Sequence, residues 1–177
     1  MALTADGVLE GSIVGSFTNL GYQVRSREWD SALLEMRGAT AIITGATSGL
    51  GLAAAKRMAA LGARVALVGR NEQKLEAAIA EVSDGTESEV AGYRADLSSL
   101  DQIRRLADEI LEGEERIDVL VNNASVLAPE RTTSVDGFEL TLATNLLGTF
   151  LLTNLLIPRL VLSTPARIVT VSSSSVS

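Results

Sequence analysis

The chain has 177 residues, 46% of them hydrophobic and 21% charged, which is enough to bury the core of a single globular domain. Its net charge is −7 and it has no block of lysine or arginine, so nothing in it attracts a polyanion and we expect no nucleic-acid partner. It contains no cysteine and no histidine, which removes disulfides, thiolate metal sites and the commonest acid–base group, so we expect no metal site.

Residues 1–37 are expected to form an extension that precedes the first strand. Leu9, Ile13, Phe17 and Leu20 recur at spacings of three and four, which predicts one short amphipathic helix. We favour packing of this helix on its own domain. Docking to a membrane surface or to a partner is the alternative, but the segment carries several acidic residues and lacks a basic face.

A short apolar run at residues 41–43 is followed by a glycine-rich turn and then by an alanine-rich helical pattern. In this turn Gly45 lets the chain leave the strand sharply, Gly49 lets backbone approach a ligand, and Gly51 lets the helix pack close to the sheet. The N–H groups at the helix start would bind a pyrophosphate. Glycine turns also serve as plain connectors, but the strand before this one and the helix after it favour a phosphate-binding turn.

The apolar run at residues 64–68 shows no alternation, which is typical of a parallel strand covered on both faces. It ends at Arg70, about 20 residues past the glycines, where an acid would bind the ribose hydroxyls of NAD and an arginine would bind the 2′-phosphate of NADP. No acid is present there, so we predict NADP, with Ser48 and Asn71 as supporting donors. The alternative is that Arg70 is a solvated loop residue.

Two further strand–helix units follow along the chain. Asn71 is expected to cap a helix over residues 72–82, and residues 90–95 to form the third strand. Ser99 and Gln102 then match a capping box for a helix that runs to residue 112.

Residues 117–121 form the fourth predicted strand, which delivers residues 122–125 to the carboxyl edge of the sheet, where ligands bind in open parallel sheets. A long apolar helix is expected over residues 136–156. It contains Asn145, which from the residues alone would be a satisfied buried amide. The last strand, residues 167–171, opens into a run of serines. These elements predict a doubly wound parallel α/β sheet of order 3-2-1-4-5.

No segment has the pattern of a signal peptide or an uninterrupted membrane span. The longest apolar run, residues 150–162, is broken by Thr153, Asn154, Pro158 and Arg159. We therefore expect a soluble, cytoplasmic protein without a membrane partner.

The motifs together resemble the short-chain dehydrogenase/reductase family over residues 38–177. The spacing Thr44-Gly45-x-x-x-Gly49-x-Gly51 is similar to that of its ordinary branch and not to the extended branch, whose second glycine lies one residue earlier. The extension, with Phe17 and Trp29 ahead of the first strand, resembles the subgroup related to dehydrogenase/reductase family member 12.

The resemblance implies an NADP-binding Rossmann-like domain over residues 38–177. Asp96 would place its carboxylate near the adenine amine, Asn123 and Ala124 would lie beside the ribose, and Asn122 would tie strands together. Ser125 stands where the family usually has glycine. The full set of implied cofactor contacts is Gly45, Thr47, Ser48, Gly49, Leu50, Gly51, Arg70, Asn71, Asp96, Leu97, Asn123, Ala124 and Ser125.

The resemblance also implies catalytic roles for two residues. Asn145 matches the family asparagine whose helix backbone holds a proton-relaying water, and Ser173, with Ser172 as second candidate, matches the serine that binds the substrate oxygen. The tyrosine and lysine of the family's Tyr-x-x-x-Lys pair have no counterpart, because Tyr22, Tyr93, Lys56 and Lys74 all lie in earlier elements.

We therefore expect the cofactor-binding portion of an NADP-dependent oxidoreductase that transfers hydride between the nicotinamide and a carbonyl or alcohol substrate. The 177-residue chain alone should be inactive. The alternative is a naturally short, non-catalytic NADP-binding or interaction module. An exposed last strand and an apolar long helix should favour a homo-oligomer or self-association.

Overall fold

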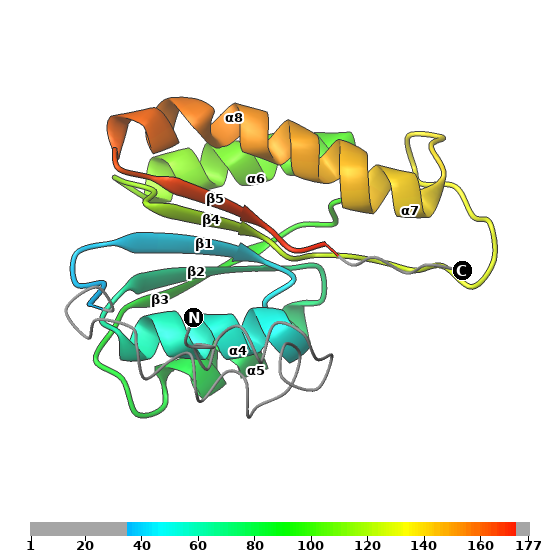
Figure 1. Cartoon of the computed structure of the whole chain (residues 1–177). Helices are drawn as coiled ribbons and strands as arrows, with labels where there is room; N and C mark the ends of the chain where they lie inside the picture. Colours follow the sequence, from blue (N-terminus) through cyan, green and yellow to red (C-terminus); the bar gives the residue numbers. More distant parts are fainter. Residues whose placement is uncertain (1–34, 173–177) are drawn as a thin grey trace, which may run out of the picture. The chain divides into compact units, whose positions relative to one another are not determined.

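The computed structural model describes residues 35–172, so the predicted amphipathic helix over residues 9–20 and the candidate Ser173 lie outside the described residues. Five parallel strands form one sheet in the order β3-β2-β1-β4-β5, which confirms the predicted fold (Figure 1). The strands are β1 (Thr40–Thr44), β2 (Arg64–Gly69), β3 (Val90–Arg94), β4 (Val119–Asn122) and β5 (Arg167–Thr170).

Helices cover both faces of this sheet. Helices α4 (Gly49–Ala60) and α5 (Glu72–Ser83) lie on one face, and α6 (Leu100–Gly113) and α8 (Thr149–Leu162) on the other (Figure 1). A short α7 (Leu140–Leu142) and a π-helix, η2 (Ala143–Gly148), lead directly into α8. Strands β2 and β3 lie on one side of β1 in the sheet, and β4 and β5 lie on the other side. The strand order therefore reverses between β1 and β4, and the crevice of the fold lies at their carboxyl ends.

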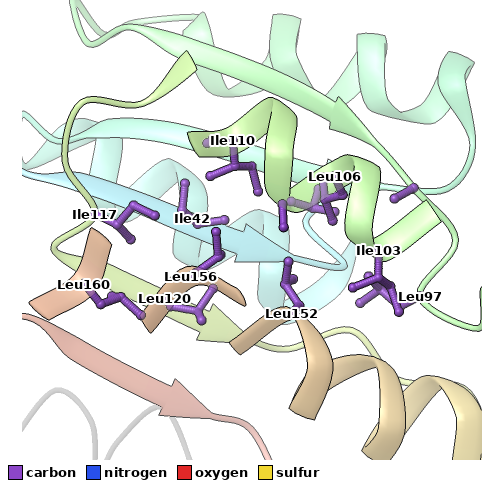
Figure 2. Packing of buried hydrophobic residues seen from close by; sticks show 14 residues of the cluster. Ile42, Leu97, Ile103, Leu106, Ile110, Ile117, Leu120, Leu152, Leu156 and Leu160 are labelled. Atoms are coloured by element: carbon purple, nitrogen blue, oxygen red, sulfur yellow. The ribbon is translucent and has the colours of Figure 1, made fainter. Parts of the chain in front are cut away.

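The buried strands explain the runs of apolar residues without alternation. Every residue of β1 is buried, as are five consecutive residues of β2, because helices pack on both sides of them. One core lies between the sheet and α6 and α8 (Figure 2); its largest members are Ile42, Ile103, Leu106, Ile110, Ile117, Leu120, Leu152 and Leu156. A second core of alanine, valine, leucine and isoleucine side chains, including Ile43, lies under α4 and α5.

The side chains of Asn71 and Ser99 cap the starts of helices α5 and α6. Asn71 Oδ1 accepts a hydrogen bond from the Lys74 N–H (2.9 Å), as predicted. Ser99 Oγ accepts from the Gln102 N–H (3.4 Å), but Gln102 Oε1 accepts from the Asp96 N–H (3.0 Å) and not from the Ser99 N–H. The Ser99 N–H already bonds to the Asp96 carbonyl (3.0 Å), so only half of the predicted capping box forms.

The long apolar helix has different ends from those predicted. It begins at Leu140 and not at residue 136, because Gly137 has a φ of 81° and the Glu139 carboxylate caps the N–H groups of Thr141 (2.8 Å) and Leu142 (2.7 Å). It continues to residue 162, past Pro158.

Tertiary contacts hold this extended end of α8. Leu160 is buried, and the Arg159 guanidinium donates to the carbonyl oxygens of Glu114 and Leu111 near the end of α6. Packing of this kind commonly overrides local propensity.

The continuous helix from Leu140 to Leu162 is long and apolar enough to cross a membrane by length and composition, with a mean hydropathy of 1.6. In the fold its Leu152 and Leu156 are buried in the core, whereas Leu146 and Phe150 are 58% and 66% exposed. The predicted exposed apolar face is therefore present on this helix.

Strand β5 pairs only with β4 among the described residues, and all four of its residues are exposed. The predicted edge strand is thus also present.

Candidate cofactor site

A cavity of about 540 Å³ lies at the carboxyl ends of the strands. The segments that follow β1, β2, β3 and β4 line it, together with Thr144 of η2. All predicted cofactor-site residues line this cavity except Gly49 and Gly51. The lining residues among those predicted are Gly45, Thr47, Ser48, Leu50, Arg70, Asn71, Asp96, Leu97, Asn123, Ala124 and Ser125. The site is thus assembled at the edge where open parallel sheets bind ligands.

Two glycines of the turn after β1 have backbone conformations that other residues rarely adopt. Gly45 has a φ of 66°, and a Cβ there would lie 2.7 Å from Ala124 Cα. Gly49 has a φ of 56°, but a Cβ there would meet nothing within 4 Å. Gly49 is therefore required for its backbone conformation, and it leaves open space at the start of α4 where a diphosphate would bind.

The third glycine makes room for a side chain. A Cβ on the buried Gly51 would lie 2.5 Å from both Asn123 Nδ2 and the Gly45 carbonyl oxygen. That Nδ2 donates to the carbonyl oxygens of Thr44 (3.0 Å) and Gly45 (3.2 Å). Gly51 therefore allows the Asn123 amide to join the end of β4 to the glycine turn.

Thr44 completes this connection. Its Oγ1 accepts from the backbone N–H groups of Asn123 and Ala124 (3.0 Å each) and lies 3.3 Å from the Val121 carbonyl oxygen, to which it donates. The prediction that Asn122 ties strands together is wrong: its Nδ2 donates to Thr153 Oγ1 on α8 (3.0 Å). The neighbouring Asn123 has the strand-joining role.

The loop after β3 holds Asp96 in place. Asp96 Oδ1 accepts from the Ser98 N–H (2.9 Å), and the Asp96 N–H donates to Gln102. The second carboxylate oxygen remains as an acceptor on a residue that lines the cavity.

Asn145 lies in the π-helix and is exposed, so the prediction of a buried amide is wrong. Its side chain is nevertheless satisfied, because Oδ1 accepts from the Val126 N–H (2.8 Å) and Nδ2 donates to the Val126 carbonyl (2.9 Å). π-Helical turns frequently occur at functional sites. Here the turn carries Asn145 to Val126, which lines the cavity.

Several lining residues were not predicted from the sequence, among them Lys74, Val126 and Thr144. Lys74 is the third residue of α5, three positions after the Asn71 cap. Its place in the first turn of this helix is the sequence signal that could have identified it as a site residue. Tyr93 does not line the cavity: its hydroxyl donates to Glu114 Oε1 (2.8 Å).

A parallel sheet with a glycine turn between β1 and α4 and a cavity across the β1–β4 crevice defines a dinucleotide-binding α/β domain. A family model described as short chain dehydrogenase matches residues 39–176, and the chain belongs to this family.

Among curated proteins, the chain is 43% identical to retinol dehydrogenase 13 of Mus musculus over 137 residues, 77% of this chain and 41% of that protein. It is 38% identical to dehydrogenase/reductase SDR family member 13 of Bos taurus over 166 residues, 93% of this chain and 44% of that protein. The chain thus spans less than half the length of these relatives. The second match includes most of residues 1–37, the segment on which the narrower resemblance is based.

Among solved structures, a metagenomic short-chain oxidoreductase in complex with NADP is 33% identical, with a TM-score of 0.71 over 79% of this chain and 64% of that chain. A short-chain type dehydrogenase/reductase from Mycobacterium marinum is 28% identical, with a TM-score of 0.68 over 78% of this chain and 55% of that chain.

Proposed function

We propose that this chain forms the cofactor-binding portion of an NADP-dependent oxidoreductase that transfers hydride between the nicotinamide and an alcohol or carbonyl substrate. The observation that carries the proposal is Arg70, which lines the cavity directly after β2, where a residue that selects between NAD and NADP is expected. A guanidinium there matches the 2′-phosphate of NADP through paired hydrogen bonds.

Two comparisons support this proposal. A related oxidoreductase is described in complex with NADP, and the name of a curated relative, retinol dehydrogenase 13, states an alcohol as its substrate.

Different residues of this chain would bind different parts of the cofactor. The N–H groups at the start of α4 would bind the diphosphate, Asp96 would accept from the adenine amine, and Asn145 would hold the Val126 segment beside the nicotinamide end. Ser173 would donate a hydrogen bond to the substrate oxygen. The bound cofactor would supply the hydride, but we assign no described tyrosine or lysine as the proton donor. Tyr93 and Lys56 are bonded to Glu114 and Glu81, and Lys74 lies after β2, beside Arg70. We therefore place binding, and not turnover, in this polypeptide.

Titration of the 177-residue polypeptide with NADPH and NADH, followed by nucleotide fluorescence and calorimetry, tests the assignment. We expect tighter binding of NADPH. Arg70→Asp should abolish or reverse the preference, because a charge-assisted hydrogen bond contributes about 1.5–3 kcal/mol, or roughly ten- to a hundredfold in affinity.

Arg57→Asp is the matched control, since Arg57 lies on α4 and does not line the cavity. Equal affinities for the two nucleotides, before and after the Arg70 substitution, would refute the assignment.

A further inference from the structure

Most basic side chains in the described part of the chain are already neutralised or bonded. Arg94 pairs with Glu72 (3.2 Å) and Arg105 with Asp101 (3.0 Å); Lys56, Arg64 and Arg116 pair with Glu81, Glu114 and Asp118. Such pairing is expected where acidic residues outnumber basic ones.

Arg70 and Lys74 are different. Within residues 35–172, neither side chain forms a salt bridge or a hydrogen bond, and both are exposed and line the same cavity. Arg57 and Arg131 also form no salt bridge within this range, but they do not line the cavity. Two cations without counter-ions therefore converge on one site in a protein of net charge −7.

Two acidic residues near these cations, Glu72 on the same helical turn and Asp96 on the same cavity, form no salt bridge with them. Lys74 is anchored because its backbone N–H donates to the Asn71 cap (2.9 Å), which places both cations beside the first turn of α5. Glu72 in that turn is paired with Arg94, and Asp96 accepts from the Ser98 N–H. The partial positive charge of the helix N-terminus adds to the charge of the two side chains.

We propose that Lys74 is a second phosphate-binding cation, which together with Arg70 binds the 2′-phosphate of NADP; this rests on the function proposed above. A phosphate monoester carries between −1.5 and −2 charges at neutral pH, as a rough value, so one guanidinium leaves it only partly neutralised. Arg70 would give planar paired hydrogen bonds, and Lys74 a compact point charge with three donors.

The cofactor diphosphate is a less suitable ligand for Lys74. It belongs at the glycine turn between β1 and α4, whereas Lys74 lies after β2, on the same loop–helix junction as Arg70. The proposal therefore predicts an effect confined to ligands that carry the 2′-phosphate.

Calorimetric titration with NADP⁺, NAD⁺, 2′,5′-ADP and 5′-AMP tests this, because the members of each pair differ only in that phosphate. Lys74→Gln should weaken NADP⁺ and 2′,5′-ADP roughly tenfold, leave NAD⁺ and 5′-AMP unchanged, and reduce the salt dependence of NADP⁺ binding. Lys74→Arg should retain most of the preference. Lys56→Gln, at a lysine on α4 outside the cavity, is the matched control.

The alternative results separate the two proposals. If Arg70→Gln lowers the NADP⁺ preference and Lys74→Gln does not, the role of Lys74 is refuted and the proposed function stands. Equal weakening of NADP⁺ and NAD⁺ by Lys74→Gln, in protein with an unchanged circular dichroism spectrum, also refutes it. If the unmodified chain binds NAD⁺ as tightly as NADP⁺, the proposed function itself fails.

Discussion

Gly51→Ala is the substitution that most directly tests how the site is built. Its Cβ would lie 2.5 Å from the Gly45 carbonyl oxygen, which is backbone, and equally close to Asn123 Nδ2. The amide must move and lose its bonds to the carbonyl oxygens of Thr44 and Gly45. Two hydrogen bonds contribute about 2 kcal/mol, and overpacking costs about 1–3 kcal/mol. The higher helix propensity of alanine offsets about 1 kcal/mol. The net loss of stability is therefore about 2–4 kcal/mol.

Gly49→Ala is the matched comparison. Gly49 has a positive φ but open space at its Cβ, so alanine there costs only the backbone conformation, about 1–2 kcal/mol. Thermal denaturation followed by circular dichroism measures both variants. Gly51→Ala should be the less stable, with a melting temperature lower by roughly 4–16 °C than that of the unmodified chain. If Gly51→Ala were as stable as Gly49→Ala or more so, the joining of the turn to β4 through Asn123 would be refuted.

Two further predictions follow from buried and exposed groups. Burial, together with the hydrogen bond to Glu114, raises the pKa of Tyr93, so the stability that Tyr93 contributes is complete below about pH 10 and is lost as the pH rises above that value. In an ultraviolet titration of the folded chain Tyr93 should ionise late, and Tyr93→Phe should remove this late ionisation; the absence of any ionisation later than that of free tyrosine would contradict this. The exposed Phe150 and the edge strand β5 should make the 177-residue polypeptide self-associate, and Phe150→Glu should weaken association in light scattering after gel filtration. A monodisperse monomer at high concentration would refute this prediction.

The strands and their order could be predicted because a parallel sheet buried on both faces leaves a simple trace in the sequence. The runs at residues 41–43 and 64–68 are apolar without interruption. Each is followed by a turn or cap that predicts a helix as the next element. The helix start at residue 140 could not be predicted in the same way. It depends on the side-chain direction of Glu139 and on the positive φ of Gly137, and an acidic residue two positions before a threonine does not by itself identify a cap.

The roles of Asn122 and Asn123 could not be separated from the sequence either. Asn122 is the last residue of β4, and its amide reaches α8, on the side where Leu120 packs. Asn123 lies one residue beyond the strand and its amide reaches the glycine turn after β1. Side chains alternate between the faces of a strand, so a one-residue difference in where the strand ends exchanges the two roles.

The two ends of the site are built on different principles. In the proposed binding mode, backbone N–H groups would recognise the cofactor at the end formed by β1 and β4, where Thr44, Asn123 and close glycine contacts fix the backbone. At the end after β2, Arg70 and Lys74 would do so, and their exposed side chains form no salt bridge or hydrogen bond within the described residues. A change in these two cations therefore alters the charge of the site without disturbing its frame. In the proposed binding mode, selection between NAD and NADP would be separable from the stability of the fold, because only the diphosphate end is part of the packed core.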